Sequence, residues 1–140
     1  MYLVDTDVIS EVRKRTNADP GVIAFFRETA RNDDALYLSA ITVGELRRGV
    51  EIIRRRGDGA QADKLEQWLT LVLREYAEGI LHFDAETAQV WGRLRVPHPE
   101  NPLDKQIAAT ALIHDLTLVT RNVRHFEGLG VRLLNPFQGA

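Results

Sequence analysis

The chain has 140 residues, a length that fits one domain with one sizeable hydrophobic core. It has no cysteine, which excludes disulfides, zinc–thiolate sites and cysteine nucleophiles, and its apolar runs are too short to span a bilayer. The formal net charge of −2 gives no overall attraction to nucleic acid. We therefore expect a single domain over residues 1–140 that is cytoplasmic, with no secretory signal and no membrane contact.

The first part of the chain alternates expected strands and helices. A short apolar run that ends in two acids, Asp5 and Asp7, predicts a buried strand. Asp19 followed by Pro20 is typical of a helix start, with the acid as N-cap and the proline at the first helical position. The expected elements are strands at 2–5 and 36–40 and helices at 6–14 and from 20 onward.

A helical hairpin is expected over residues 42–77. Apolar side chains at helical spacing follow Thr42, glycines interrupt the pattern at Gly57 and Gly59, and a second amphipathic stretch covers 60–77. The rest of the chain predicts strands at 80–83, 116–120 and 131–135, a helix capped by Asp84, a loop over 96–102 and a helix that begins at Asp104.

Strands separated by helices favour a mostly parallel sheet with helices on both faces. In such a sheet, sites form outside the carboxyl ends of the strands. Asp5 ends the first strand, Glu45 is expected in the first turn of the helix after the second strand, and Asp104 starts the helix before the fourth. Because Asn122 follows the fourth strand, we expect these four polar residues to meet at one edge.

Three clustered carboxylates repel one another. Two unit charges about 4 Å apart cost roughly 4 kcal/mol at an effective dielectric constant near 20. A proton on one acid or a shared cation relieves this repulsion. With oxygen ligands and no cysteine, Mg²⁺ or Mn²⁺ is the expected guest, and such an ion assists attack on a phosphoryl group.

Each candidate residue also has a structural explanation. Glu45 fits a capping box with Thr42, Asp104 fits an N-cap, and Asn122 fits a turn. Asp5 is harder to explain in this way, because an acid beside an apolar core needs a partner. His125 lies near Asn122 in the sequence and is a weak candidate for substrate contact.

Four segments together give the chain a resemblance to a known family. "LVDTDVISE", "YLSAITVGELRRGV", "DKQIAATALIHDLTLVTRN" and "LLNPF" resemble the PIN-domain family, and its VapC/FitB-type toxins in particular. The resemblance covers nearly the whole chain. It implies a three-layer α/β/α sandwich around a central, mostly parallel sheet of about five strands in the order 3-2-1-4-5.

The resemblance also implies a function, namely hydrolysis of RNA phosphodiesters by a Mg²⁺- or Mn²⁺-dependent ribonuclease that leaves a 5′ phosphate. The family's acids map onto Asp5, Glu45 and Asp104, which would hold the metal. The fourth acidic position is Asn122, which stays in the expected catalytic set but leaves a second tightly held metal in doubt. Asp7 stands where relatives often carry a small polar residue, and it is expected to have a supporting role at most.

Partners follow from the same resemblance. Toxins of this type are neutralised by a VapB/FitA-type antitoxin, so operator DNA would be contacted only indirectly, through the antitoxin. A homodimer or a toxin–antitoxin hetero-oligomer is expected, with the 42–77 hairpin contributing to the partner surface. The alternatives are an RNA-processing PIN nuclease that is not a toxin, a non-catalytic PIN-fold binding module, and a phosphatase of the haloacid dehalogenase type suggested by "DTDVI".

Overall fold

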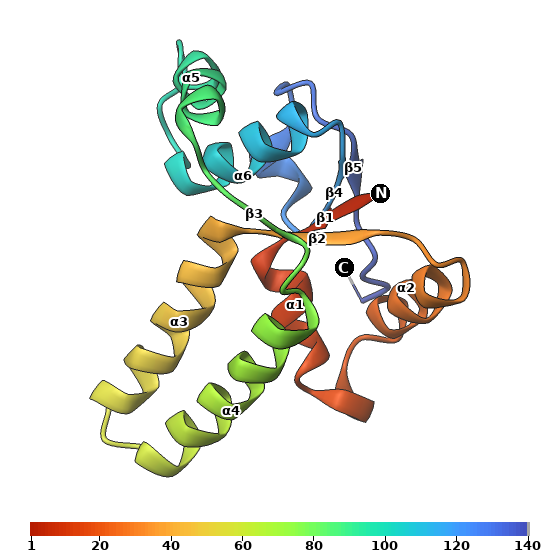
Figure 1. The fold of residues 1–140 in the computed structure, drawn as a ribbon, viewed down its shortest axis with the longest axis vertical. Helices are drawn as coiled ribbons and strands as arrows, with labels where there is room; N and C mark the ends of the chain where they lie inside the picture. The colour runs from red at the N-terminus through yellow and green to blue at the C-terminus, as the bar shows by residue number, and fades with distance from the viewer. Residues whose placement is uncertain (140) are drawn as a thin grey trace.

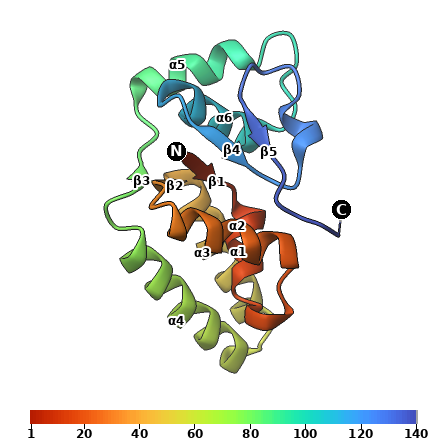
Figure 2. The same cartoon turned by 90° about the vertical axis from the view of Figure 1, so that its right-hand side faces the viewer.

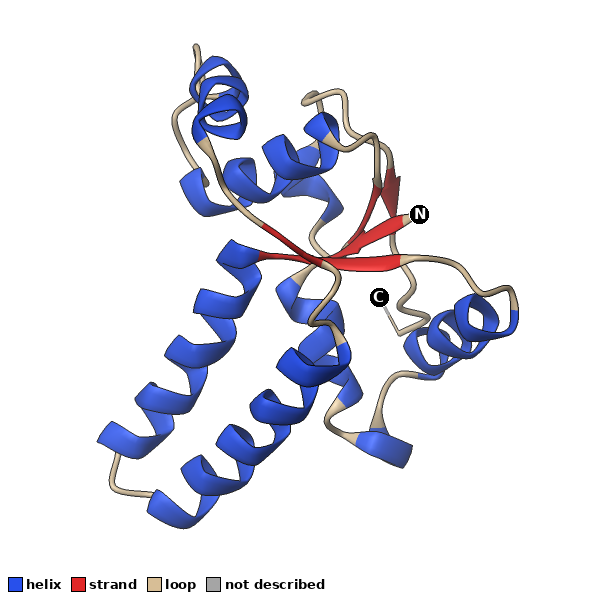
Figure 3. Cartoon of the chain, in the orientation of Figure 1, coloured by secondary structure: helices blue, strands red, loops and turns tan. Residues whose placement is uncertain are grey.

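A five-stranded parallel sheet lies between two layers of helices in the computed structural model, which describes residues 1–139 (Figures 1 and 3). The strand order β3-β2-β1-β4-β5 confirms the order expected from the resemblance, and every pair of neighbours is parallel. The strands are β1 (Tyr2–Val4), β2 (Leu36–Ser39), β3 (Ile80–Leu81), β4 (Thr117–Val119) and β5 (Leu133–Leu134).

The helices divide between the two faces of the sheet. In both views of the ribbon, α5 and α6 cover one face, and α1 to α4 cover the other (Figures 1 and 2). The helices are α1 (Thr6–Val12), α2 (Pro20–Arg31), α3 (Ala40–Arg55), α4 (Gly59–Glu75), α5 (Ala85–Leu94) and α6 (Pro102–Ile113), with short 3₁₀ turns η1 (Arg15–Asn17) and η2 (Val123–Phe126). No helix of the described residues is both long and apolar enough to cross a bilayer.

Each face of the sheet has its own hydrophobic core, because successive side chains of a strand point to opposite faces. On β1, Val4 packs with the core under α1 to α4, and Leu3 packs with the core under α6. Both side chains are fully buried. The central strand is therefore covered on both faces, which fixes the position of the residue that follows it.

Side-chain caps set where the helices begin. Asp19 caps α2 and Asp84 caps α5, as predicted, each through a carboxylate that accepts a backbone N–H. The predicted start of α3 at Thr42 is wrong. Ser39 accepts a hydrogen bond from the backbone N–H of Ile41 at 3.0 Å, so α3 begins at Ala40.

The predicted start of α6 at Asp104 is also wrong. Pro102 occupies the first turn, where its missing N–H and fixed φ are tolerated, and the residue before the helix is Asn101 with a left-handed φ of 54°. The side chain of Asn101 makes no capping bond. Asp104 therefore lies inside the first turn of α6 and is not its N-cap.

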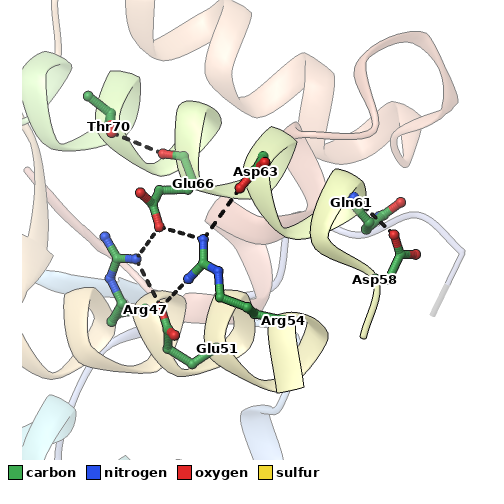
Figure 4. A network of polar contacts seen from close by, with 8 residues as sticks. All are labelled: Arg47, Glu51, Arg54, Asp58, Gln61, Asp63, Glu66 and Thr70. Carbon is green, nitrogen blue, oxygen red and sulfur yellow. Dashed lines mark hydrogen bonds and ion pairs between the residues drawn. The ribbon is translucent and has the colours of Figure 1, made fainter. Parts of the chain in front are cut away.

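Helices α3 and α4 form the hairpin expected near residues 42–77, and they lie side by side in Figure 1. Two arginines of α3 join this pair of helices (Figure 4). Arg47 and Arg54 both donate to the carboxylate of Glu66 on α4, at 2.9 and 2.8 Å, and both also donate to Glu51. These side chains are 38–52% exposed, so water screens the ion pairs, and packing of the apolar faces contributes more to hairpin stability.

Candidate functional site

A cavity of about 240 Å³ opens at the carboxyl ends of the central strands. Its lining brings together all four residues singled out from the sequence, which arrive from four separate parts of the chain. The lining residues are Asp5, Thr6, Asp7, Glu45, Leu103, Asp104, Ile107 and Asn122.

Asp5 lies directly after β1 and is only 4% exposed. It caps α1, because its Oδ1 accepts the backbone N–H of Thr6 at 2.8 Å. Its Oδ2 accepts the hydroxyl of Thr120 at 2.8 Å, at the end of β4. Burial raises the pKa of Asp5 to about 7, and the negative charges of Asp7 and, more weakly, Asp104 act in the same direction.

Asp7 lies in the first turn of α1 and has one bonded and one free oxygen. Its Oδ2 accepts the backbone N–H of Arg121 at 3.0 Å. Its Oδ1 is buried and has no hydrogen-bond partner among residues 1–139. Burial raises the pKa of Asp7, and the charge of Asp104 adds to the shift.

Glu45 lies in the second turn of α3, not in the first as predicted, because Ser39 starts the helix earlier. This position removes the capping-box explanation that we considered for Glu45, since Thr42 is a fully buried residue inside the helix. The hydroxyl of Thr42 instead pairs with that of Thr6 at 3.1 Å, which ties α3 to α1 beside the cavity.

Asp104 reaches the cavity from α6, and its Oδ2 lies 2.7 Å from Nδ1 of His125. An ionised carboxylate can only accept a hydrogen bond, so Nδ1 of His125 is the donor. His125 thus holds one oxygen of Asp104 in place. In the sequence, only its proximity to Asn122 pointed to His125.

Asn122 lies between β4 and η2 and is connected to Asp5 through a threonine. The backbone N–H of Asn122 donates to the hydroxyl oxygen of Thr120 at 3.0 Å, and that hydroxyl donates to Asp5. The backbone carbonyl of Asn122 accepts the backbone N–H of His125, so Asn122 also serves as a turn residue. Its side-chain amide makes no bond that caps η2.

The ligand atoms that the cavity offers suit a hard divalent cation. All of its polar side chains offer oxygen or amide groups and none offers sulfur, which suits Mg²⁺ or Mn²⁺. Asp7 Oδ1 adds a buried oxygen without a protein donor. Within residues 1–139, however, no three Asp, Glu or His side chains are grouped closely enough to form a ready-made metal site. Oxygens of Asp5 and Asp104 are held by protein donors instead.

Asp7 was expected to have a supporting role at most, and its role stays a prediction. In the structure, it is the cavity acid that has a buried oxygen without a hydrogen-bond partner among residues 1–139. The available signal was its place in the first turn of a helix that leaves directly from a strand end. That position aims its side chain at the same edge as Asp5.

Known proteins resemble the chain over nearly its full length. The toxin FitB of Neisseria gonorrhoeae is 36% identical over 98% of this chain and 99% of its own, and the VapC ribonuclease Y4jK of Sinorhizobium fredii is 34% identical over 100% of both chains. Among solved structures, FitAcB from Neisseria gonorrhoeae has a TM-score of 0.83 at 36% identity, covering 97% of this chain and 98% of that one. The structure of FitAB bound to an IR36 DNA fragment also has a TM-score of 0.83, at 34% identity, and the match covers 97% of this chain and 95% of that one.

The family itself is matched across most of the sequence. Residues 2–130 match the PIN domain, and this range contains every side chain that lines the acidic cavity. The fold, the strand order and the full-length relatives agree with that match. The chain therefore belongs to the PIN-domain family.

Proposed function

We propose that this protein is the toxin component of a VapBC-type toxin–antitoxin system and acts as a Mg²⁺- or Mn²⁺-dependent ribonuclease. The observation that carries the proposal is the cavity in which Asp5, Glu45 and Asp104 meet at the carboxyl edge of the sheet. The names of two full-length relatives, a toxin and a ribonuclease, support the same assignment.

Asp5, Glu45 and Asp104 would hold the metal ion, directly or through water. When bound, the ion would polarise a phosphoryl oxygen and lower the pKa of a water molecule. Asp5 is held in position by Thr6 and Thr120, and Asp104 is held in position by His125. The amide of Asn122 is a donor and acceptor at the cavity rim, suited to orienting water or a phosphate oxygen.

The reaction would be a direct hydrolysis. Water adds to phosphorus, the bond to the 3′ oxygen breaks, and that oxygen takes up a proton, leaving a 5′ phosphate and a 3′ hydroxyl. The backbone of Arg121 lies beside the cavity, because its N–H donates to Asp7, and its guanidinium stacks on the ring of Phe137, with the guanidinium carbon 4.6 Å from the ring centre. A guanidinium held in this way is suited to an RNA phosphate. Single-stranded RNA is the expected substrate, because its backbone can enter a cleft.

A second groove supports the expected antitoxin. This groove of about 280 Å³ lies between α1, α3 and α4, and shares Thr6 and Glu45 with the acidic cavity. Its lining is mostly apolar, with Trp68 at one side and two arginines, Arg13 and Arg56. A partner segment in this groove would lead directly to the acids. We expect the protein to work in the cytoplasm, as a homodimer or in a hetero-oligomer with its antitoxin, and to reach operator DNA only through that antitoxin.

Inducible expression in a bacterium that lacks the antitoxin tests the biological role. Wild-type protein is expected to arrest growth and degrade RNA, and Asp5→Asn is expected to do neither, because it removes a central carboxylate while keeping the side-chain shape. Asp63→Asn is the matched control, since it makes the same chemical change at an exposed residue of α4 that does not line the cavity. Growth arrest of equal strength from wild type and Asp5→Asn would reject the nuclease as the cause of toxicity.

A further inference from the structure

Asp7 stands out among the cavity residues because one of its oxygens is buried without a partner. Oδ2 accepts the backbone N–H of Arg121, and this bond explains the position of the carboxylate. It does not explain Oδ1, which has no donor among residues 1–139 although it is shielded from solvent. A buried carboxylate oxygen that lacks a donor is unfavourable unless a cation or a proton satisfies it.

The bond to Arg121 also places Asp7 next to Asn122. Arg121 is the residue immediately before Asn122, and both Asp7 and Asn122 line the same cavity. Asn122 brings a neutral amide to the end of β4, whereas Asp7 brings a carboxylate to the same place from α1. The cavity thus retains four carboxylates, from Asp5, Asp7, Glu45 and Asp104.

We propose that Asp7 is a direct ligand of the divalent cation through its free Oδ1 and supplies the negative charge that Asn122 does not. This inference rests on the proposed function, since it concerns the same ion. The two oxygens of the Asp7 carboxylate have different contacts. Oδ2 holds the side chain against the end of β4, and Oδ1 of the same cavity-lining residue is buried without a donor among residues 1–139.

Asp7→Asn separates the ligand role from the structural one. The amide oxygen of the new side chain can still accept the N–H of Arg121, so the contact between α1 and the end of β4 is kept while the charge is lost. Mn²⁺ alone, titrated calorimetrically into the metal-free protein without RNA, is the probe. We expect Asp7→Asn to weaken Mn²⁺ binding at least about tenfold, since loss even of an outer-shell partner of a metal costs roughly 10- to 100-fold.

The double variant Asp7→Asn with Asn122→Asp tests where the charge is needed. Asn122→Asp restores a fourth carboxylate to the cavity, now on the residue that follows Arg121. Mn²⁺ affinity is therefore expected to recover to within about threefold of wild type. Asp63→Asn, which changes the charge by the same amount on exposed α4, is expected to leave the affinity unchanged. Asp7→Ser provides a second neutral variant should Asp7→Asn fail to fold, and the same loss is expected.

The outcomes distinguish this inference from the proposed function. If Mn²⁺ binds wild type and Asp7→Asn with affinities within twofold, Asp7 only joins α1 to the end of β4 and the inference is overturned, while RNA cleavage by wild type would still support the nuclease. If the double variant stays as weak as Asp7→Asn, position 122 does not substitute for position 7, and the compensation is overturned. Absence of Mn²⁺ binding to wild type would contradict both the inference and the metal dependence.

Discussion

Among single residues, Asp5 is the most buried acid of the cavity and bonds to both α1 and the end of β4. Its two oxygens each accept one hydrogen bond, yet the pKa is raised to about 7 because burial opposes the charge more strongly than the bonds favour it. Because this pKa lies close to neutral pH, a small change of pH in that range changes whether Asp5 carries a proton. A divalent cation would compete with that proton for the same oxygens.

The raised pKa predicts a pH-dependent stability of the metal-free protein. Folded Asp5 keeps its proton up to about pH 7, whereas in the unfolded chain it ionises near its ordinary pKa of 3.8. The stabilising contribution is therefore complete below about pH 4 and is lost as pH rises through 7. In EDTA, the free energy of unfolding of wild type relative to Asp5→Asn should fall by about 2–3 kcal/mol between about pH 5 and pH 8.

Urea unfolding of both proteins at the two pH values checks this prediction. Comparing the two proteins cancels the groups that they share. A difference between wild type and Asp5→Asn that does not change with pH would show that Asp5 is already ionised in the folded protein at pH 5.

At the scale of elements, the start of a helix decides where each acid stands. Because Ser39 caps α3, the helix begins at Ala40, and Glu45 lies in its second turn. Because α6 begins at Pro102, Asp104 lies in its first turn. The loop before α6 is held by the buried Lys105, whose ammonium donates to the carbonyls of His98 and Glu100. A lysine inside this helix therefore positions the segment that presents Asp104.

The α3–α4 hairpin offers a test of what holds an element in place. Glu66→Gln removes the carboxylate that joins Arg47 and Arg54 across the hairpin. Because these side chains are partly exposed and screened by water, we expect only a small loss of stability that shrinks further in high salt. Leu69→Ala, one turn further along α4 and 1% exposed, should cost about 2–5 kcal/mol. Urea unfolding at low and high salt compares the two, and equal losses would contradict this ranking.

Element order and strand positions could be predicted from the sequence, because short apolar strands and caps such as Asp19 are local signals. The acids at the strand ends followed from the general rule for parallel sheets. Helix starts at Ala40 and Pro102 were missed, since two possible caps compete within a few residues and the sequence does not rank them. The burial of Lys105 and the free oxygen of Asp7 depend on contacts between distant segments, which no local pattern contains.

At the scale of the whole molecule, a two-faced parallel sheet brings four distant segments to one edge. The central position of β1, between β2 and β4, places Asp5 at the middle of that edge. Both cores are needed to hold this position, because β1 contributes a buried side chain to each. The groove beside α3 and α4 joins the same edge through Glu45, so a partner segment bound in it, as proposed above, would lie next to the acids.

RNA cleavage by the purified protein tests the central claim most directly: that Asp5, Glu45 and Asp104 act together on a divalent cation. Wild type with Mg²⁺ or Mn²⁺ should cut single-stranded RNA into products with 5′ phosphates, EDTA should stop the reaction, and Asp5→Asn and Asp104→Asn should each lower the rate on the order of 100-fold or more. Asp63→Asn should cleave like wild type. Cleavage that continues in EDTA and survives both cavity substitutions would contradict the account.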